Sequence, residues 1–281
     1  MSTATSASGR DRSAKREGEL PPSPPPLATP ALDSHCHLDL MKVDVEEVMA
    51  SAKAVGIERV VQIGIDVPSS RWSVELAESR DDVWAAVAVH PNEAHAANEE
   101  IWTEIERLAA APRVVAVGET GLDHFRTEEG GWVPQEESFR RHIAIAKQTG
   151  KAVMIHDREA HDDVLRVLES EGAPERVIFH CFSGDADFAR KCADRGYVMS
   201  FAGNVTFKNA QDLRDAAAVA PLDQLLVETD APFLTPMPYR GAPNSPYLVP
   251  LTVRAIAEAK GVDEDEVAAA VTATAARVFN W

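Results

Sequence analysis

The sequence predicts an α/β fold, a (β/α)8 barrel of the TIM type that occupies residues 30–281. Short apolar runs rich in β-branched residues alternate with longer segments of helical period, which is typical of parallel sheets buried on both faces. Eight such pairs fit into about 250 residues, the usual length of this barrel. The competing fold is a doubly wound open sheet, but the first strand-to-helix turn lacks the glycine fingerprint expected there.

Each predicted strand is followed by a helix. The first strand begins at Ala31 and leads into His35 and His37. The other strands are predicted at 59–64, 83–89, 114–117, 152–155, 177–179, 197–199 and 224–227. Apolar residues at helical spacing indicate the helices, several of which end at a glycine. These helices are predicted at 45–55, 67–78, 97–110, 139–149, around 164–168, at 186–194, around 213–220, and as two helices within 248–279.

Residues 1–29 differ from the rest and are predicted to form a disordered tail. They are rich in Ser, Ala, Pro and Arg and include the run Pro-Pro-Ser-Pro-Pro-Pro. Such a segment cannot bury enough apolar surface to offset the entropy of ordering it. It also lacks the hydrophobic core of a secretion signal. A nucleic-acid-binding arm is the alternative interpretation of its basic residues.

Composition narrows the class of protein. The apolar share of 45% and the charged share of 26% are those of a soluble globular protein. No apolar run approaches the ~20 residues of a membrane-spanning helix. Three scattered cysteines indicate no disulfide framework, so a reducing cytoplasm is expected. The net charge of −17 argues against a broad basic surface for duplex DNA, so a nucleic-acid substrate must be held locally by metal ions and a few arginines.

Polar residues stand at the carboxyl ends of five predicted strands. These residues are His35, His37, Glu119, His156, His180 and Asp230. Because the carboxyl ends of parallel barrel strands meet at one mouth, we expect these side chains to converge. Imidazoles and carboxylates suit divalent ions such as Zn2+, Mn2+ or Mg2+. Six ligands exceed the needs of one tetrahedral ion, which favours two ions about 3.5–4 Å apart and bridged by a carboxylate.

A series of motifs then resembles the TatD-like family of metal-dependent deoxyribonucleases, part of the amidohydrolase barrel superfamily. The motifs are, in order, Ser-His-Cys-His-Leu, Ala-Val-His-Pro, Gly-Glu-Thr-Gly-Leu-Asp, Ile-His-Asp-Arg-Glu-Ala, His-Cys-Phe-Ser-Gly, Val-Thr-Phe-Lys-Asn-Ala, Glu-Thr-Asp-Ala-Pro-Phe-Leu-Thr-Pro and Tyr-Arg-Gly. The resemblance covers residues 31–281.

The resemblance implies that two divalent ions are bound and that a phosphodiester is hydrolysed. It assigns His35, His37 and Asp230 to one ion and His156 and His180 to the other, with Glu119 as the bridge. Glu119 and Asp230 are the expected catalytic residues. Asp230 is expected to orient the attacking water or to take its proton, in addition to binding metal.

Three further residues near the predicted mouth are candidate substrate contacts. His90 follows the third strand, and it either contacts substrate or fixes a loop. Arg158 and Arg240 are expected to pair with phosphate, because guanidinium groups match phosphate oxygens. The alternative for both arginines is an ordinary surface salt bridge.

Two residues beside the fourth strand complete the predicted site. Asp123 is expected to support Glu119 through a hydrogen bond. His124 stands where many relatives carry an aromatic residue, and it is either an additional ligand or a substrate contact. The loop 126–133 is acidic and rich in glycine, which fits poorly with binding a polyanion. Hydrolysis is therefore predicted more firmly than DNA as the substrate.

The leading functional hypothesis is a nuclease that acts on single-stranded DNA or DNA ends, since a barrel mouth admits a strand end more readily than a duplex. The first alternative is a metal-dependent amidohydrolase, esterase or deacylase acting on a small or aminoacyl substrate, which the acidic surface favours. The second is a binding protein without catalysis, against which the complete ligand set argues. No membrane or protein partner is predicted.

Overall fold

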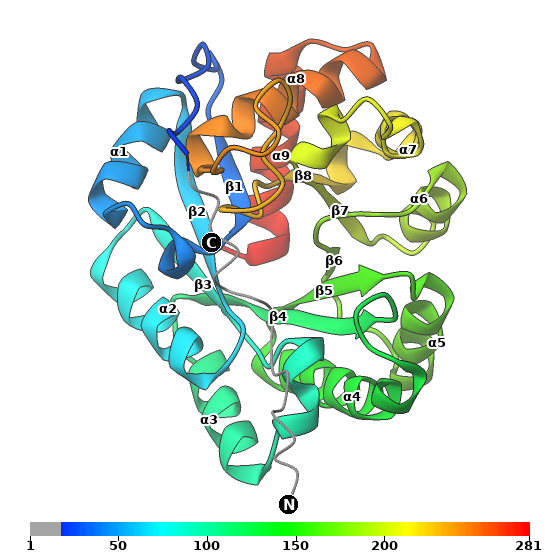
Figure 1. Cartoon of the computed structure of the whole chain (residues 1–281). Helices are drawn as coiled ribbons and strands as arrows, with labels where there is room; N and C mark the ends of the chain where they lie inside the picture. The colour runs from blue at the N-terminus through cyan, green and yellow to red at the C-terminus, as the bar shows by residue number, and fades with distance from the viewer. Residues whose placement is uncertain (1–17) are drawn as a thin grey trace, which may run out of the picture.

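The computed structural model describes residues 18–281, and it confirms the predicted barrel (Figure 1). The strands form one eight-stranded sheet in sequence order, and each neighbouring pair is parallel. They are β1 (Ala31–Cys36), β2 (Ile57–Gly64), β3 (Val83–Val87), β4 (Val114–Asp123), β5 (Ala152–Arg158), β6 (Val177–Phe179), β7 (Val198–Phe201) and β8 (Leu225–Val227).

Helices surround the sheet, and Figure 1 shows them as an outer ring. They are α1 (Val45–Ala54), α2 (Val67–Ser79), α3 (Glu99–Ala109), α4 (Trp132–Thr149), α5 (His161–Glu171), α6 (Ala186–Ala193), α7 (Gln211–Val219), α8 (Val249–Lys260) and α9 (Glu264–Phe279). Short 3-10 helices precede or follow several of them, among them η2 (Pro91–Ala96), η4 (Gly203–Thr206) and η6 (Pro246–Leu248). None of the helices within residues 18–281 is long and apolar enough to cross a membrane.

The ring of strands closes between β1 and the residues that follow β8. The backbone N–H of Asp230 donates to the carbonyl of His35 at 2.9 Å, and the N–H of His37 donates to the carbonyl of Ala231 at 2.8 Å. These bonds lie at the carboxyl ends of the strands. Closure therefore brings His35 and His37, at the end of the first strand, next to Asp230, which follows the last strand.

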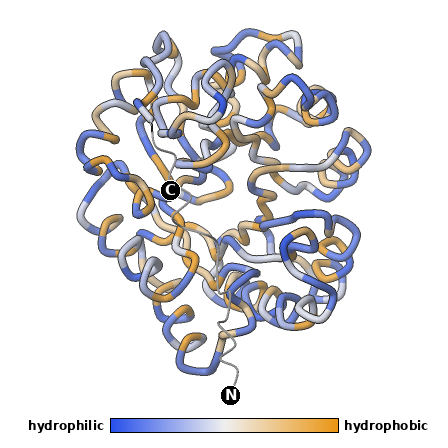
Figure 2. Tube along the Cα trace, in the orientation of Figure 1, coloured by the Kyte–Doolittle hydropathy of each residue, from blue (hydrophilic) through white to orange (hydrophobic). Residues whose placement is uncertain are grey.

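Two apolar layers stabilise the barrel. The larger layer lies between the strands and the helices, with residues such as Ile105, Phe139 and Leu168 fully buried. The smaller one fills the interior of the barrel, with residues such as Met154 and Ile178. Figure 2 shows hydrophobic colour concentrated along the central strands. This packing fills the barrel and leaves its polar residues at the mouth.

Strand β4 is longer than predicted, so that both Glu119 and Asp123 lie within it. The sequence predicts that it ends at 117, but it runs to Asp123 because its second half pairs with β5. Gly121 lies opposite His156 in this pairing and has a φ of 133°, a conformation that favours glycine. A Cβ atom there would lie 2.2 Å from the carbonyl oxygen of His156. Only glycine therefore allows the two strands to approach so closely.

The prediction that the N-terminal tail is disordered is wrong for residues 18–29, which the structure places against the barrel. Residues 1–17 lie outside the described part of the chain. The carbonyl of Pro21 accepts a hydrogen bond from the Tyr247 hydroxyl at 2.5 Å. The carbonyl of Pro25 accepts one from the Arg254 guanidinium at 3.0 Å. Leu27 is buried against the barrel. Donors from distant helices compensate for the segment's lack of apolar residues, so it is held in place.

Replacing Leu27 by alanine tests this packing. Because Leu27 is only 6% exposed, we expect Leu27→Ala to lower the free energy of unfolding by roughly 2–5 kcal/mol, as other buried leucines do. Leu20 is 38% exposed, so Leu20→Ala is the matched control and should change it by less than about 0.5 kcal/mol. Urea unfolding followed by circular dichroism measures both. Equal stability of the two variants would show that the segment does not contribute to the fold.

Candidate metal centre at the mouth of the barrel

The structure places all six predicted ligands together at the carboxyl ends of the strands. His35 lies in β1 and His37 directly after it, Glu119 lies in β4, His156 in β5, His180 directly after β6, and Asp230 in the loop after β8. Most are buried, and only His156 and Asp230 are partly exposed. Residues almost 200 positions apart in the sequence are therefore neighbours because the strands are parallel and the sheet is closed.

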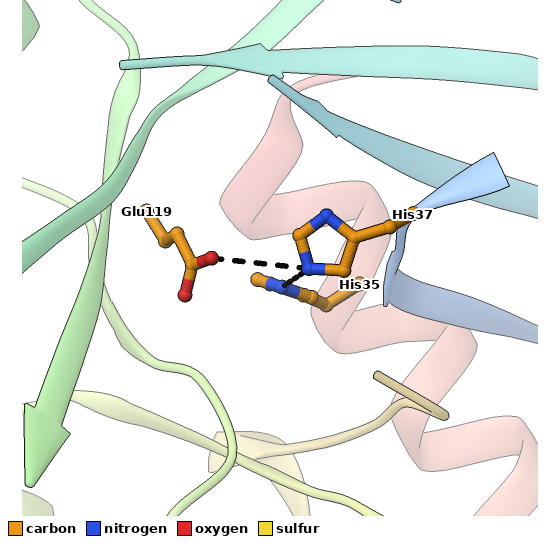
Figure 3. Close-up of side chains that lie close together, drawn as sticks. All are labelled: His35, His37 and Glu119. Atoms are coloured by element: carbon orange, nitrogen blue, oxygen red, sulfur yellow. Dashed lines mark hydrogen bonds and ion pairs between the residues drawn. The ribbon is translucent and has the colours of Figure 1, made fainter. Parts of the chain in front are cut away.

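Glu119 lies at the centre of this cluster. Its Oε2 atom is 2.9 Å from His180 Nε2 and 3.3 Å from His156 Nδ1. Its Oε1 atom faces the other side and is 3.8 Å from His37 Nε2 (Figure 3). The two oxygens thus point to different groups of histidines, as those of a bridging carboxylate do.

The second half of the cluster consists of His35, His37 and Asp230. The two Nε2 atoms are 3.3 Å apart. Asp230 Oδ1 lies 3.4 Å from His37 Nε2 and 3.7 Å from His35 Nε2. The i, i+2 spacing puts both imidazoles on the same side, while Cys36 between them packs into the outer core.

Two buried carboxylates hold the histidines next to Glu119. Glu228 Oε1 lies 3.2 Å from His180 Nδ1 and accepts a hydrogen bond from the Cys181 N–H at 2.9 Å. Asp123 Oδ2 lies 3.2 Å from His156 Nε2. Such partners fix the orientation of an imidazole and make it a better metal ligand.

Glu228 is not among the predicted site residues, and Asp123 supports a different residue from the predicted one. Asp123 supports His156, whereas the prediction has it supporting Glu119. Glu228 stands two residues before Asp230, so an i, i+2 spacing like that of His35 and His37 was the signal that could have found it. These pairings depend on which side chains face each other across strands.

His35 contacts a sulfur atom, whereas His156 and His180 contact carboxylates. Its Nδ1 atom is 3.2 Å from the sulfur of Met154, which lies inside the barrel below the cluster. Because a thioether only accepts hydrogen bonds, Nδ1 carries the proton and Nε2 keeps its lone pair for the cluster. The ring of His35 also stacks on that of His180, with centroids 3.9 Å apart.

The electrostatics of the cluster reflect its many carboxylates. Burial opposes protonation of His180, but the negative charges of Glu228 and Glu119 and the hydrogen bonds to them outweigh it and raise the pKa of His180 to about 10. Burial raises the pKa of Asp123, but its hydrogen bond to His156 and the charge of that imidazole lower it to about 2. A proton therefore occupies His180 in the metal-free protein at neutral pH.

His90 lies in the mouth beside the cluster. Its Nε2 atom is 3.7 Å from Glu119 Oε2. Its Nδ1 atom accepts the backbone N–H of Asn92 at 3.1 Å, where it caps η2. A neutral imidazole that accepts at Nδ1 carries its proton on Nε2, so His90 presents a hydrogen-bond donor to the mouth. His90 thus fixes a loop, and its buried ring lies next to the cluster.

Arg158 and Arg240 both lie at the mouth, and each guanidinium lies over an aromatic ring. Arg158 is 4.0 Å from the centroid of the Phe125 ring, and Arg240 is 4.3 Å from that of the Phe207 ring. The surface salt bridges considered as the alternative are not found for either arginine within residues 18–281. His124 stacks on Trp132, with ring centroids 3.9 Å apart, so its ring packs within its own loop.

The cluster fits divalent metal ions by the chemistry of its donors. Three sets of side chains have potential ligand atoms within 4.8 Å of one another, namely His35 with His37 and Glu119, His35 with His180 and Glu228, and His90 with Glu119 and His156. Imidazole and carboxylate donors together accept Zn2+, Mn2+ and Mg2+. A parallel eight-stranded barrel with such a cluster at its mouth belongs to the class of metal-dependent hydrolases.

Comparison with known proteins identifies the family. The family model described as "TatD related DNase" matches residues 32–280, and the chain belongs to this TatD family of metal-dependent hydrolases. The uncharacterized metal-dependent hydrolase TatD of Mycobacterium tuberculosis is 47% identical over 256 residues, which cover 88% of this chain and 97% of that protein. The uncharacterized metal-dependent hydrolase YcfH of Escherichia coli K12 is 41% identical over 256 residues, 89% of this chain and 95% of that protein.

Solved structures agree with this assignment. The crystal structure of the TatD homologue YjjV from Escherichia coli K12 matches with a TM-score of 0.84 and 27% identity, covering 89% of this chain and 98% of YjjV. The crystal structure of a TatD family hydrolase from Entamoeba histolytica matches with a TM-score of 0.80 at 17% identity, covering 90% of this chain and 98% of that one. The second comparison supports the fold alone.

Proposed function

We propose that the protein is a deoxyribonuclease that hydrolyses phosphodiester bonds in single-stranded DNA or at DNA ends with two divalent ions, Mg2+, Mn2+ or Zn2+. The cluster divides into two halves that share one carboxylate, which is the arrangement of two-ion sites. The ligands of this proposal are His35, His37 and Asp230 in one half and His156 and His180 in the other, with Glu119 between them.

The observation that supports a phosphate-containing substrate is that Arg158 and Arg240 form no ion pair with a carboxylate among the described residues. The chain has a net charge of −17, and many of its arginines pair with carboxylates, as Arg140 and Arg166 do with Glu136. Within residues 18–281, Arg158 at the end of β5 and Arg240 in the loop after β8 have no such ion pair, and each lies over an aromatic ring. Their charges are therefore available to the oxygens of a phosphodiester.

The residues of the mouth then have distinct roles. Divalent ions held by the cluster supply Lewis acidity, which polarises phosphoryl oxygens and makes water more acidic. Asp230, the more exposed of the two catalytic carboxylates, orients the attacking water or accepts its proton. His90 donates its Nε2–H to a phosphate oxygen. Arg158 and Arg240 hold the flanking phosphates and exclude an uncharged substrate from the same position.

We also propose that the protein is cytoplasmic. Cys36, Cys181 and Cys192 are all free thiols in the structure. Reducing compartments keep thiols free, whereas small secreted domains use them in disulfides. The free thiols support a cytoplasmic location.

Metal-dependent cleavage of a short single-stranded oligonucleotide tests this function. With Mg2+ or Mn2+ the purified protein should cleave the oligonucleotide, excess chelator should abolish cleavage, and added ion should restore it, because water is activated only at the cluster. Denaturing gel electrophoresis resolves the products. A panel of N-acyl and ester compounds serves as the comparison. Cleavage that persists in excess chelator, or hydrolysis of acyl compounds without any cleavage of DNA, would contradict the proposal.

A further inference from the structure

Phe125 is an exposed aromatic residue beside the candidate metal centre. It is 57% exposed, whereas phenylalanines such as Phe139, Phe179 and Phe201 are fully buried. Leaving a phenylalanine ring in water forgoes the free energy of its burial, which a contact with a bound molecule would recover. The sequence motifs assign no role to this residue.

The backbone of Phe125 is tied to the cluster through a single carboxylate. Asp123 Oδ2 lies 3.2 Å from His156 Nε2. The other oxygen of Asp123, Oδ1, accepts the backbone N–H of Phe125 at 3.1 Å and that of Arg126 at 2.8 Å. The exposed ring is therefore carried by a turn whose position relative to the cluster is set by Asp123.

Neighbouring residues hold this turn in place. His124 stacks on Trp132, and the indole N–H of Trp132 donates to the carbonyl of Thr127 at 2.9 Å. The hydroxyl of Thr127 accepts a hydrogen bond from Gln135 at 2.8 Å. Side chains on both sides of Phe125 are thus engaged within the loop, and the ring of Phe125 is left projecting from it.

Arg158 lies between the Phe125 ring and the strand that carries His156. It stands two residues after His156 in β5, so both side chains leave the strand on the same face. Its guanidinium lies 4.0 Å from the centroid of the Phe125 ring and covers one face of it. The large exposure of Phe125 leaves the rest of the ring in contact with solvent.

We propose that Phe125 stacks on an unpaired nucleobase of the substrate while Arg158 binds the adjacent phosphate, so that this pair selects single-stranded DNA over duplex. The inference rests on the proposed nuclease function and names its substrate recognition. Aromatic rings bind bases of any sequence because every base has a π-face. In a duplex both faces of a base are already covered by neighbouring base pairs, so the ring gains this contact only from a single strand or a frayed end.

The test compares Phe125→Ala with the wild type on two single-stranded oligonucleotides, one intact and one with abasic residues around the cleaved bond. Removing the ring should raise KM for the intact strand by roughly five- to a hundredfold, the range for loss of one stacked base. The wild type should show a similar loss on the abasic strand. The variant should not distinguish the two strands, because the ring and the base act through each other.

Three controls accompany this comparison. Phe125→Trp, which keeps a π-face, should preserve the low KM for the intact strand. Val133→Ala removes the other exposed apolar side chain of the same region, 64% exposed, and should leave KM unchanged. The abasic strand, which has no base to stack around the cleaved bond, should be hydrolysed equally by Phe125→Ala and the wild type.

The outcomes separate this inference from the proposed function. If Phe125→Ala and the wild type have the same KM for the intact strand, or if both discriminate equally against the abasic strand, the stacking role is overturned while the nuclease stands. If the wild type hydrolyses neither the intact nor the abasic strand in the presence of Mg2+ or Mn2+, the nuclease function itself fails. Thermal unfolding of each variant shows whether the fold is retained.

Discussion

Replacing Glu119 by glutamine should reduce hydrolysis by at least about a thousandfold, beyond the 10–100-fold typical when only an outer partner of a metal ligand is removed. The carboxylate is buried between His180 Nε2 at 2.9 Å and His37 Nε2 at 3.8 Å. Glutamine keeps its shape but removes the charge and turns one oxygen into a donor. In the proposed two-ion site, Glu119→Gln would therefore lose the carboxylate that both ions share.

Glu228→Gln is the matched control for Glu119→Gln, since it neutralises a second buried carboxylate, which lies 3.2 Å from the ring nitrogen of His180 that does not face Glu119. We expect it to weaken metal affinity by about 10–100-fold and to leave hydrolysis near the wild-type rate at saturating metal. Isothermal titration calorimetry gives the number and affinity of the ions, and oligonucleotide cleavage gives the activity. Full activity and two bound ions in Glu119→Gln would show that Glu119 is no bridge.

Metal affinity should rise about tenfold for each pH unit from pH 7 to 9. Burial opposes a charge on His180, but Glu228 and Glu119 outweigh it and raise its pKa to about 10 in the metal-free protein. An ion that binds Nε2 must displace this proton, so binding releases one proton per cluster throughout this range. Calorimetry in buffers of different ionisation enthalpy measures the proton release, and titrations across pH measure the affinity.

The same shift predicts the stability of the metal-free protein. Because the pKa of His180 is higher in the folded than in the unfolded state, its contribution to stability is complete below about pH 6.5 and is lost as the pH rises through 10. Metal-free protein should therefore melt at a lower temperature at pH 9 than at pH 7. His180→Gln should not show this lower melting temperature at pH 9. Its metal affinity should also rise less than tenfold for each pH unit. An affinity independent of pH in the wild type would mean that His180 is already deprotonated.

Much of the fold and of the candidate site follows from local sequence. Apolar runs such as 152–155 indicate buried strands, and the alternation with helices indicates a parallel barrel. Parallel strands end at one mouth, so the position of a polar residue at a strand end is enough to predict its neighbours. For this reason the sequence suffices to place His156 and His180 beside Glu119.

The boundary of the tail shows where local sequence is insufficient. Its proline-rich composition offers few apolar contacts, and composition alone therefore predicts disorder. The carbonyl groups of this segment accept hydrogen bonds from Tyr247 and Arg254, more than 220 positions away. Contacts of that separation have no local signature.

The sequence by itself therefore determined the class of fold, the mouth and the set of candidate metal ligands that converge there, because periodicity and strand ends are local properties. Only the tertiary structure decided which residues support them: Glu228 behind His180, Asp123 behind His156, and Met154 beneath His35. It also decided that Phe125 is exposed beside Arg158. These contacts depend on the register and closure of strands distant in sequence, where a shift of one residue turns a side chain to the opposite face.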